Sequence, residues 1–214
     1  MNDRFWDPGG NPDLKNEYAY SFEFGYKLDH QISQSVDIQY ELDYYSNYIR
    51  DMIQWHPGES YFWVADNIGS VNSSGLESSL HIKYVVNDLS INLNAGYSFT
   101  RARDINIESE TYGKQLIYIP ENQAINSLNI AYKTIYSTLK NSYIGRIYTT
   151  PDNMDFLKGY TINNLTTGIK FNIKENSIDV RFIIENIFDK SYETIAYYPQ
   201  PGRTYFLALS FHLQ

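Results

Sequence analysis

The sequence predicts an all-β fold: an antiparallel, up-and-down segment of a transmembrane β-barrel. Apolar and polar residues alternate with a period of two in about nine segments, as expected for strands whose two faces meet different surroundings. Several segments extend for about ten residues, which fits a tilted membrane strand of roughly 9–11 residues better than an average globular strand of roughly 5–6 residues. Short and long breaks alternate strictly between the segments, like the short periplasmic turns and long extracellular loops of membrane barrels.

The alternation is clear in the first expected strand, where Tyr18, Phe22 and Phe24 share one face and Ser21 and Glu23 share the other. Residues 137–149 are also strand-like, although their two faces are poorly separated, and no segment shows a convincing helical period. The expected strands begin at Tyr18, Val36, Leu76, Leu89, Leu128, Ser137, Leu165, Ile178 and Tyr205.

The connections between the expected strands fall into two groups. The short polar breaks are residues 29–33, 87–88, 135–136 and 174–176, and the long breaks are residues 54–67, 104–121, 151–159 and 189–203. A Greek-key sandwich gives no reason for such a rhythm, whereas an up-and-down membrane barrel has it.

Composition limits the possible functions. The 214 residues carry a net charge of -8, which argues against nucleic-acid binding, and include no cysteine, which excludes disulfides and thiolate sites. The 21 Tyr, 11 Phe and 3 Trp suit membrane interfaces, but taken alone they favour a Tyr-rich soluble β protein. No run approaches the roughly 18 apolar residues of a membrane helix. Residues 1–10 show no signal peptide.

The polar face carries charges deep inside the strands, among them Glu41, Asp179 and Arg181. Such a face meets either a hydrated barrel lumen or bulk water, and the pattern alone does not separate the two. Two sheets that cover each other's apolar faces would give a soluble β-sandwich, so a carbohydrate-binding sandwich stays open as the alternative. An outer-membrane barrel enzyme is a third hypothesis, but no group of catalytic residues can be assembled for it.

The C-terminal stretch, residues 185–207, reads ENIFDKSYETIAYYPQPGRTYFL. It resembles the C-terminal signature of TonB-dependent receptors, in which an Asn-Leu-Phe-Asp-like element ends the penultimate strand and Pro-Gly-Arg precedes an aromatic-rich last strand. Ile187 replaces the commoner Leu. Arg203 flanks the same loop as Asp189, so the two side chains either pair across the loop or serve turn chemistry with a solvated arginine, and the sequence favours the second reading. The residues that carry the resemblance as a structural motif are Asn186, Phe188, Asp189, Tyr192, Pro201, Gly202 and Arg203.

A second resemblance to the same family lies near the start of the chain. Residues 10–17 read GNPDLKNE and are similar to the family's Gly-Asn-Pro-x-Leu-Lys-Pro-Glu element, with Asn16 in place of the usual Pro. Further landmarks at Trp55, Gly69 and Glu77 extend the resemblance, in order, over nearly the whole chain. The chain ends in Gln214, whereas such barrels usually end in an aromatic residue used for assembly.

The resemblance implies a 22-stranded barrel with an N-terminal plug domain inside it. Residues 1–214 would form about the last nine strands, with the plug absent, so we expect a truncated gene product or a fragment of a longer protein. The implied function is part of an outer-membrane transporter that takes up a scarce ligand of the siderophore, corrinoid, haem or oligosaccharide class. The implied partners are outer-membrane lipid, the TonB system through the missing plug, and the barrel assembly machinery, with no nucleic acid.

Chemical sites are not expected on the sequence. His30, His56, His81 and His212 are scattered without metal-ligand spacing, so we expect no metal, no cofactor and no enzymatic activity. The aromatic residues of two long breaks are the candidates for ligand contact. These candidates are Trp55, His56, Tyr61, Trp63, Tyr197 and Tyr198.

Overall fold

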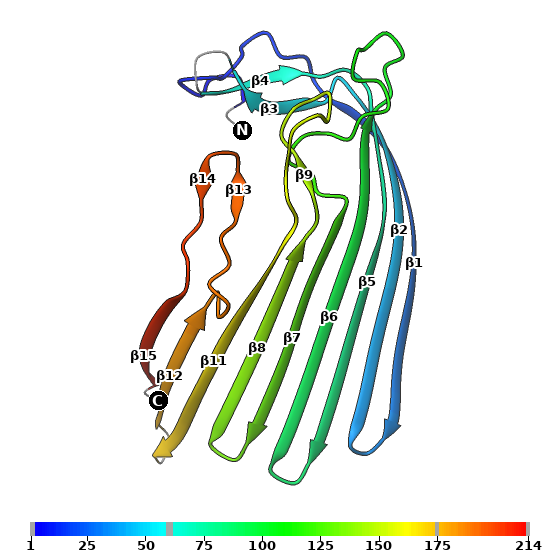
Figure 1. Ribbon diagram of the computed structural model, residues 1–214. Helices are drawn as coiled ribbons and strands as arrows, with labels where there is room; N and C mark the ends of the chain where they lie inside the picture. Colours follow the sequence, from blue (N-terminus) through cyan, green and yellow to red (C-terminus); the bar gives the residue numbers. More distant parts are fainter. Residues whose placement is uncertain (1–2, 59–61, 174–175, 213–214) are drawn as a thin grey trace.

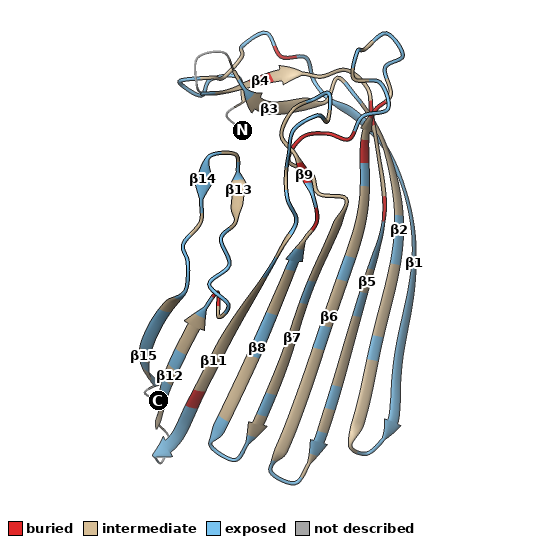
Figure 2. Ribbon diagram, in the orientation of Figure 1, coloured by how far each residue is buried: buried red, intermediate tan, exposed pale blue. Residues whose placement is uncertain are grey.

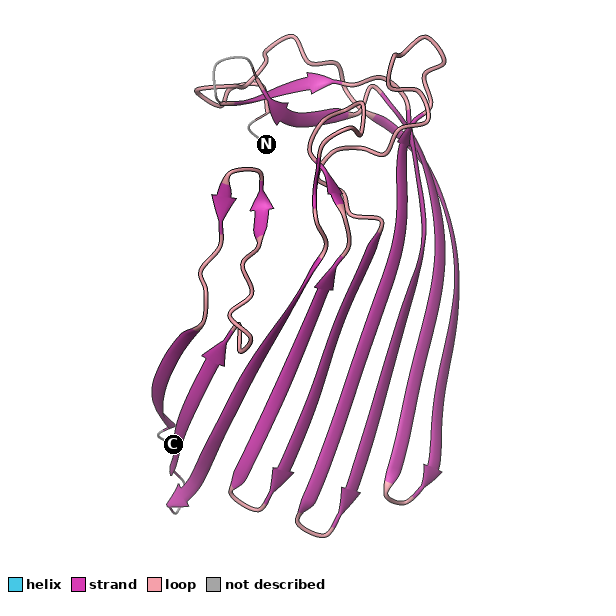
Figure 3. Cartoon of the chain, viewed as in Figure 1, coloured by secondary structure: helices cyan, strands magenta, loops and turns pink. Residues whose placement is uncertain are grey.

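The computed structural model describes residues 3–58, 62–173 and 176–212, which consist of strands and loops only (Figure 3). Nine long strands form one antiparallel sheet in the order β1-β2-β5-β6-β7-β8-β11-β12-β15. Their bounds are β1 Tyr18–Ser33, β2 Val36–Arg50, β5 Val71–Val86, β6 Leu89–Asp104, β7 Asn122–Tyr132, β8 Ile135–Ile144, β11 Tyr160–Ile173, β12 Asn176–Glu185 and β15 Thr204–His212. The nine expected strands are therefore confirmed.

Within the described residues, no helix has the length and apolar character needed to cross a membrane.

Each long strand pairs with the next long strand along the chain, so the sheet is an up-and-down meander (Figure 1). The turns at residues 34–35, 87–88 and 133–134 lie at one end of the sheet, and the long connections lie at the other. β1 continues to Ser33, past the break expected from residue 29, because its pairing with β2 extends to Val36. The expected rhythm of short and long connections is confirmed for these parts, but the break expected at residues 135–136 is wrong. The chain turns at residues 133–134, where Lys133 has a φ of 53°, and β8 already begins at Ile135.

Three long connections contain small hairpins that the sequence did not predict. They are β3 Ile53–Pro57 with β4 Trp63–Asn67, β9 Ile147–Tyr148 with β10 Phe156–Leu157, and β13 Glu193–Ile195 with β14 Tyr198–Pro199. These strands have two to five residues each, so they show no alternation long enough to detect. In Figure 1 they gather at the loop end of the sheet.

The register keeps the two faces of the sheet chemically distinct. Pairs such as Tyr40↔Leu80 and Ile91↔Ile130 place apolar residues beside apolar residues across neighbouring strands. We call this apolar side the outward face and the opposite, polar side the lumen face. Aromatic residues stand near both ends of the outward face, as in the aromatic girdles of membrane barrels. Those near the turns are Tyr84, Tyr132 and Phe171, and those near the loops are Tyr48, Tyr97 and Tyr143.

The outward face is not covered by a second layer in the described part of the chain. Ile130 and Leu139 lie on interior strands, yet each is 42% exposed. The other described sheets are the three two-stranded hairpins at the loop end. A β-sandwich would bury these apolar side chains between two large sheets, so the structure does not support the sandwich alternative.

Two tyrosines on the lumen face lie across glycines of the neighbouring strand. A Cβ atom on Gly168 would lie 2.6 Å from the Tyr136 Cζ atom, and one on Gly75 would lie 2.6 Å from the Tyr45 Cζ atom. The Tyr136 hydroxyl donates to Asp179 at 2.8 Å. The glycines therefore make room for rings that tie neighbouring strands together.

The best-buried part of the chain lies at the loop end and not in the middle of the sheet (Figure 2). Val71, Ala102 and Leu116 form a small apolar cluster there. Gln115, which is 4% exposed, accepts a hydrogen bond from the Ala102 backbone N–H at 3.0 Å. This core fixes the long connection after β6 against the sheet and so gives the loop end a defined shape.

Candidate functional site

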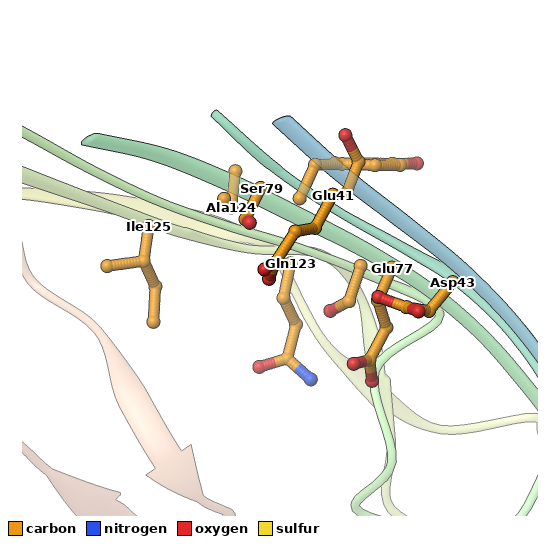
Figure 4. A pocket seen from close by; sticks show the side chains of 11 residues that line it. Glu41, Asp43, Glu77, Ser79, Gln123, Ala124 and Ile125 are labelled. Atoms are coloured by element: carbon orange, nitrogen blue, oxygen red, sulfur yellow. The ribbon is translucent and has the colours of Figure 1, made fainter. Parts of the chain in front are cut away.

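The lumen face of β1, β2 and β5 carries a group of carboxylates. Asp43 and Glu77 stand directly opposite each other on β2 and β5, and Glu41 lies two residues from Asp43. Together with polar side chains from β6 and β7, these residues line a shallow concavity of about 360 Å³. Glu41, Glu77 and Gln123 project from one side of the sheet in Figure 4.

Only part of this negative charge is neutralised. The Lys27 ammonium lies 2.7 Å from a Glu41 oxygen and 4.0 Å from Asp29. Asp43 and Glu77 have no ion pair among the described residues. Like charges directly opposite each other destabilise an isolated sheet, so this arrangement favours a cationic group that reaches the lumen face from outside the sheet.

The predicted ligand contacts Trp55, His56 and Trp63 come together in the β3–β4 hairpin, where Trp55 pairs with Ala65 and His56 with Val64. All three are partly buried and already have partners. The Trp55 indole donates to Asp3 at 3.0 Å, and the Trp63 ring lies 5.1 Å from the Tyr118 ring. Tyr61 lies outside the described residues.

His56 lines a pocket of about 150 Å³ at the loop end, together with Asp104 and Lys114. The His56 Nε2 atom lies 3.0 Å from an Asp66 oxygen, so Asp66 orients the ring. Burial raises the pKa of Asp104, but hydrogen bonds from Ser109, Thr111 and the Asn106 backbone N–H outweigh it, so the pKa lies below its usual value. Asp104 therefore stays ionised.

Tyr197 and Tyr198 lie in a different hairpin, β13–β14, whose contact outside itself is with β10. Their side chains are 92% and 65% exposed. The structure therefore does not bring them together with the β3–β4 residues. It leaves two separate aromatic groups at the loop end, of which Tyr197 and Tyr198 are the more accessible.

The C-terminal motif joins the two ends of the last long connection. Asn186 follows β12 and is 4% exposed. Its side-chain Nδ2 donates to the Lys190 and Pro201 carbonyls at 2.9 and 3.4 Å, and its Oδ1 accepts from the Lys190 backbone N–H at 2.8 Å. The Asn186 side chain is thus hydrogen-bonded both to the start and to the end of the connection formed by residues 189–203.

Asp189 and Gly202 complete this closure. The Asp189 Oδ1 atom accepts a hydrogen bond from the Arg203 backbone N–H at 2.8 Å, and the described residues show no ion pair between the Asp189 and Arg203 side chains. A Cβ atom on Gly202 would lie 2.6 Å from that same oxygen. Tyr192 packs its ring 4.6 Å from Tyr160 at the start of β11, whereas Phe188 is 74% exposed.

The sequence analysis named Glu41 as a charge deep inside a strand on the polar face but gave it no role. What it missed is that Glu77 lies opposite Asp43 on the next strand. The available signal was the repeated placement of acids on the polar face of neighbouring strands. The register that brings them together depends on pairing between strands.

The uncovered outward face and the charged lumen face define the class of protein: a section of the wall of a membrane-embedded β-barrel. Residues 1–187 match the family described as "TonB dependent receptor-like, beta-barrel". The chain belongs to this family, whose members are receptors and transporters, and it is part of an outer-membrane barrel.

The chain is 25% identical over 219 residues to the vitamin B12 transporter BtuB of Photobacterium profundum, covering 99% of this chain and 33% of that protein. It is 27% identical over 218 residues to the vitamin B12 transporter BtuB of Vibrio vulnificus, covering 99% of this chain and 32% of that protein. The chain therefore spans about a third of the length of these curated relatives.

Among solved structures, the chain is similar to the ferric-catecholate import receptor Fiu from K12 E. coli in its closed form. The TM-score is 0.67 at 20% sequence identity, and the similar region covers 94% of this chain and 28% of that chain. At this identity the likeness shows the shared fold.

Proposed function

We propose that the chain forms the last nine strands of the barrel of an outer-membrane, TonB-dependent transporter for a scarce ligand. The observation that carries this proposal is the single sheet with an uncovered apolar face on one side and a charged face on the other. Lipid would cover the apolar face, and water in the barrel lumen would solvate the charged face. Transport is favoured over catalysis because the family consists of receptors and transporters.

The remaining strands of the barrel and the plug would come from the part of the protein outside residues 1–214. β1 and β15 are the edges of the described sheet, and lipid does not tolerate unpaired backbone groups at such edges. Further strands would satisfy them, with insertion by the barrel assembly machinery. The acidic lumen group around Asp43 and Glu77 would face cationic side chains of the plug, which in turn would connect the barrel to TonB.

The ligand class is a corrinoid, siderophore, haem or oligosaccharide. Both curated relatives are named as vitamin B12 transporters, which favours a corrinoid for the first test. The exposed rings of Tyr197 and Tyr198 are the best-placed contacts at the loop end, and Trp55, His56, Tyr61 and Trp63 are the second group. Aromatic rings suit large planar or apolar ligands.

The test is uptake of radiolabelled cyanocobalamin by cells that lack their own corrinoid transporter and express the full-length protein. We expect uptake that saturates with ligand and disappears when the host's TonB gene is deleted. Parallel cultures receive ferric siderophores, haem or oligosaccharides to define the ligand. Uptake that continues without TonB would contradict the proposal, as would a soluble full-length protein found outside the outer membrane.

A further inference from the structure

Charged residues of the nine long strands are divided by face. Strand alternation and register place the carboxylates and lysines of these strands on the lumen face, within the described residues. The charged residues that fall on the outward face are Arg50, Arg101 and Arg103. In a chain of net charge -8, an outward face whose only charges in the described strands are arginines calls for a specific explanation.

The three arginines lie at the loop end of β2 and β6, on either side of β5. Arg103 pairs across the sheet with Asn72, and Asn72 pairs with Tyr48, two residues before Arg50. With neighbouring strands about 4.8 Å apart, the Cα atoms of Arg50 and Arg103 are on the order of 12 Å apart. The long loops mark this end as the extracellular one, so the arginines lie at the level of the outer leaflet's headgroups.

The guanidinium groups have few partners within the described chain. Arg50 and Arg101 are exposed; Arg50 interacts with the Tyr48 hydroxyl, and the Arg101 guanidinium lies 5.4 Å from the centre of the Phe99 ring. Arg103 lies 3.7 Å from a Glu121 oxygen, too far for a hydrogen bond, and its buried Nε atom has no hydrogen-bond partner. These unmet donors, with the planar fork of the guanidinium, suit an anion with several oxygens.

The surface below the arginines is apolar. Tyr44, Leu76 and Tyr97 lie on the same outward face, nearer the turns, and are 43%, 39% and 43% exposed. Ser74 stands between these residues and Arg101, with which it pairs. A ligand that fits this surface needs an anionic group to meet the arginines and an apolar part to lie on the strip below them. An amphiphile with a phosphorylated headgroup and acyl chains has both.

We propose that Arg50, Arg101 and Arg103 bind the phosphorylated headgroup of an outer-leaflet lipid whose acyl chains lie along the apolar strip of β2, β5 and β6. The site is on the outside of the barrel wall, so it is separate from the lumen and from ligand uptake. Arginines whose guanidinium groups only extend into water at the membrane interface would bind phosphorylated and dephosphorylated lipids equally well. This difference makes the proposal testable.

The experiment uses the full-length protein in nanodiscs of zwitterionic lipid. Bis-phosphorylated lipid A, its dephosphorylated form with the same acyl chains, and inorganic phosphate are added separately, and native mass spectrometry counts the bound molecules. The test variant carries Arg50→Gln, Arg101→Gln and Arg103→Gln. Since each arginine near an anionic lipid surface contributes a factor of about five, the variant should bind phosphorylated lipid A roughly 100-fold more weakly.

A matched control removes three charges from the lumen face of the same sheet. Lys83, Lys140 and Lys170 are exposed there, and their triple replacement by Gln changes the net charge of the protein by the same amount. The control should bind phosphorylated lipid A as the wild type does. Heat-modifiable migration in gels establishes that each variant is folded before binding is measured.

Retention of phosphorylated lipid A by the wild type and the lysine variant, with loss in the arginine variant, supports the site. Equal retention by the arginine variant overturns it, and so does equal loss in both triple variants, which would reflect overall charge. Equal binding of dephosphorylated lipid A would show that the phosphate is not recognised and would overturn it as well. Displacement of the lipid by millimolar inorganic phosphate alone would point to a free-anion site and also overturn the proposal.

Discussion

The packing of Tyr136 over Gly168 gives a sharp prediction about the barrel wall. In Gly168→Ala, the new Cβ atom would lie 2.6 Å from the Tyr136 Cζ and hydroxyl oxygen atoms and 2.9 Å from its Cε1 atom. The ring must move, and the 2.8 Å hydrogen bond from its hydroxyl to Asp179 is lost. A strained side chain costs about 0.5–1.5 kcal/mol and a hydrogen bond to a charged acceptor about 1.5–3 kcal/mol, so we expect a loss of about 2–4 kcal/mol.

The assay is urea unfolding of the full-length protein in detergent micelles, followed by tryptophan fluorescence and heat-modifiable migration. The matched control is Gly96→Ala on the same lumen face, because a Cβ atom there would meet only the Ile125 carbonyl, at 3.5 Å. We expect that control to be close to neutral. The reasoning would be refuted if Gly168→Ala were as stable as Gly96→Ala.

A double-mutant cycle separates the two contributions. Tyr136→Phe keeps the ring and removes the hydroxyl, so it should cost about 1.5–3 kcal/mol by itself. In that background Gly168→Ala should cost only the strain, because the hydrogen bond has already gone. Full additivity of the two changes would show that the ring keeps its hydrogen bond to Asp179 when the alanine is present.

Three further predictions concern the loop end. Gly202→Ala would displace the Asp189 carboxylate from the Arg203 backbone N–H, so protease should cut the 189–203 connection faster; an unchanged cleavage pattern would contradict this. Because the folded pKa of Asp104 is lowered, its stabilising effect is present above the ordinary aspartate pKa and is lost as the pH falls below about 4. The protection factors of the amides in residues 105–114, taken relative to the intrinsic exchange rate at each pH, should therefore fall on acidification in the wild type but show no such step in Asp104→Asn. Tyr197→Ala should raise the KM for uptake several-fold with an unchanged maximal rate, since its ring is 92% exposed; an unchanged KM would remove Tyr197 from the ligand contacts.

The sequence by itself predicted the nine strands, the two faces of the sheet and the up-and-down order in which antiparallel strands follow one another. Side chains of a strand alternate strictly between faces, so the apolar rows that start at Tyr18 and Leu89 are visible without coordinates. The family resemblance at Asn186 and Gly202 could also be read from the sequence alone. The role of Asn186 in closing the last long connection could not be read from the sequence, because its side chain donates hydrogen bonds to Lys190 near the start of that connection and to Pro201 near its end.

The short hairpins, the Tyr136–Gly168 contact, the opposed Asp43 and Glu77, and the outward arginines were decided by the tertiary structure. Each depends on which residues stand opposite one another, and a shift of one residue would reverse the faces of a whole strand. The local sequence shows which residues alternate within one strand. The register between two strands depends on the packing of each strand against all of its neighbours. That is why the faces of this sheet could be predicted and the sites on them could not.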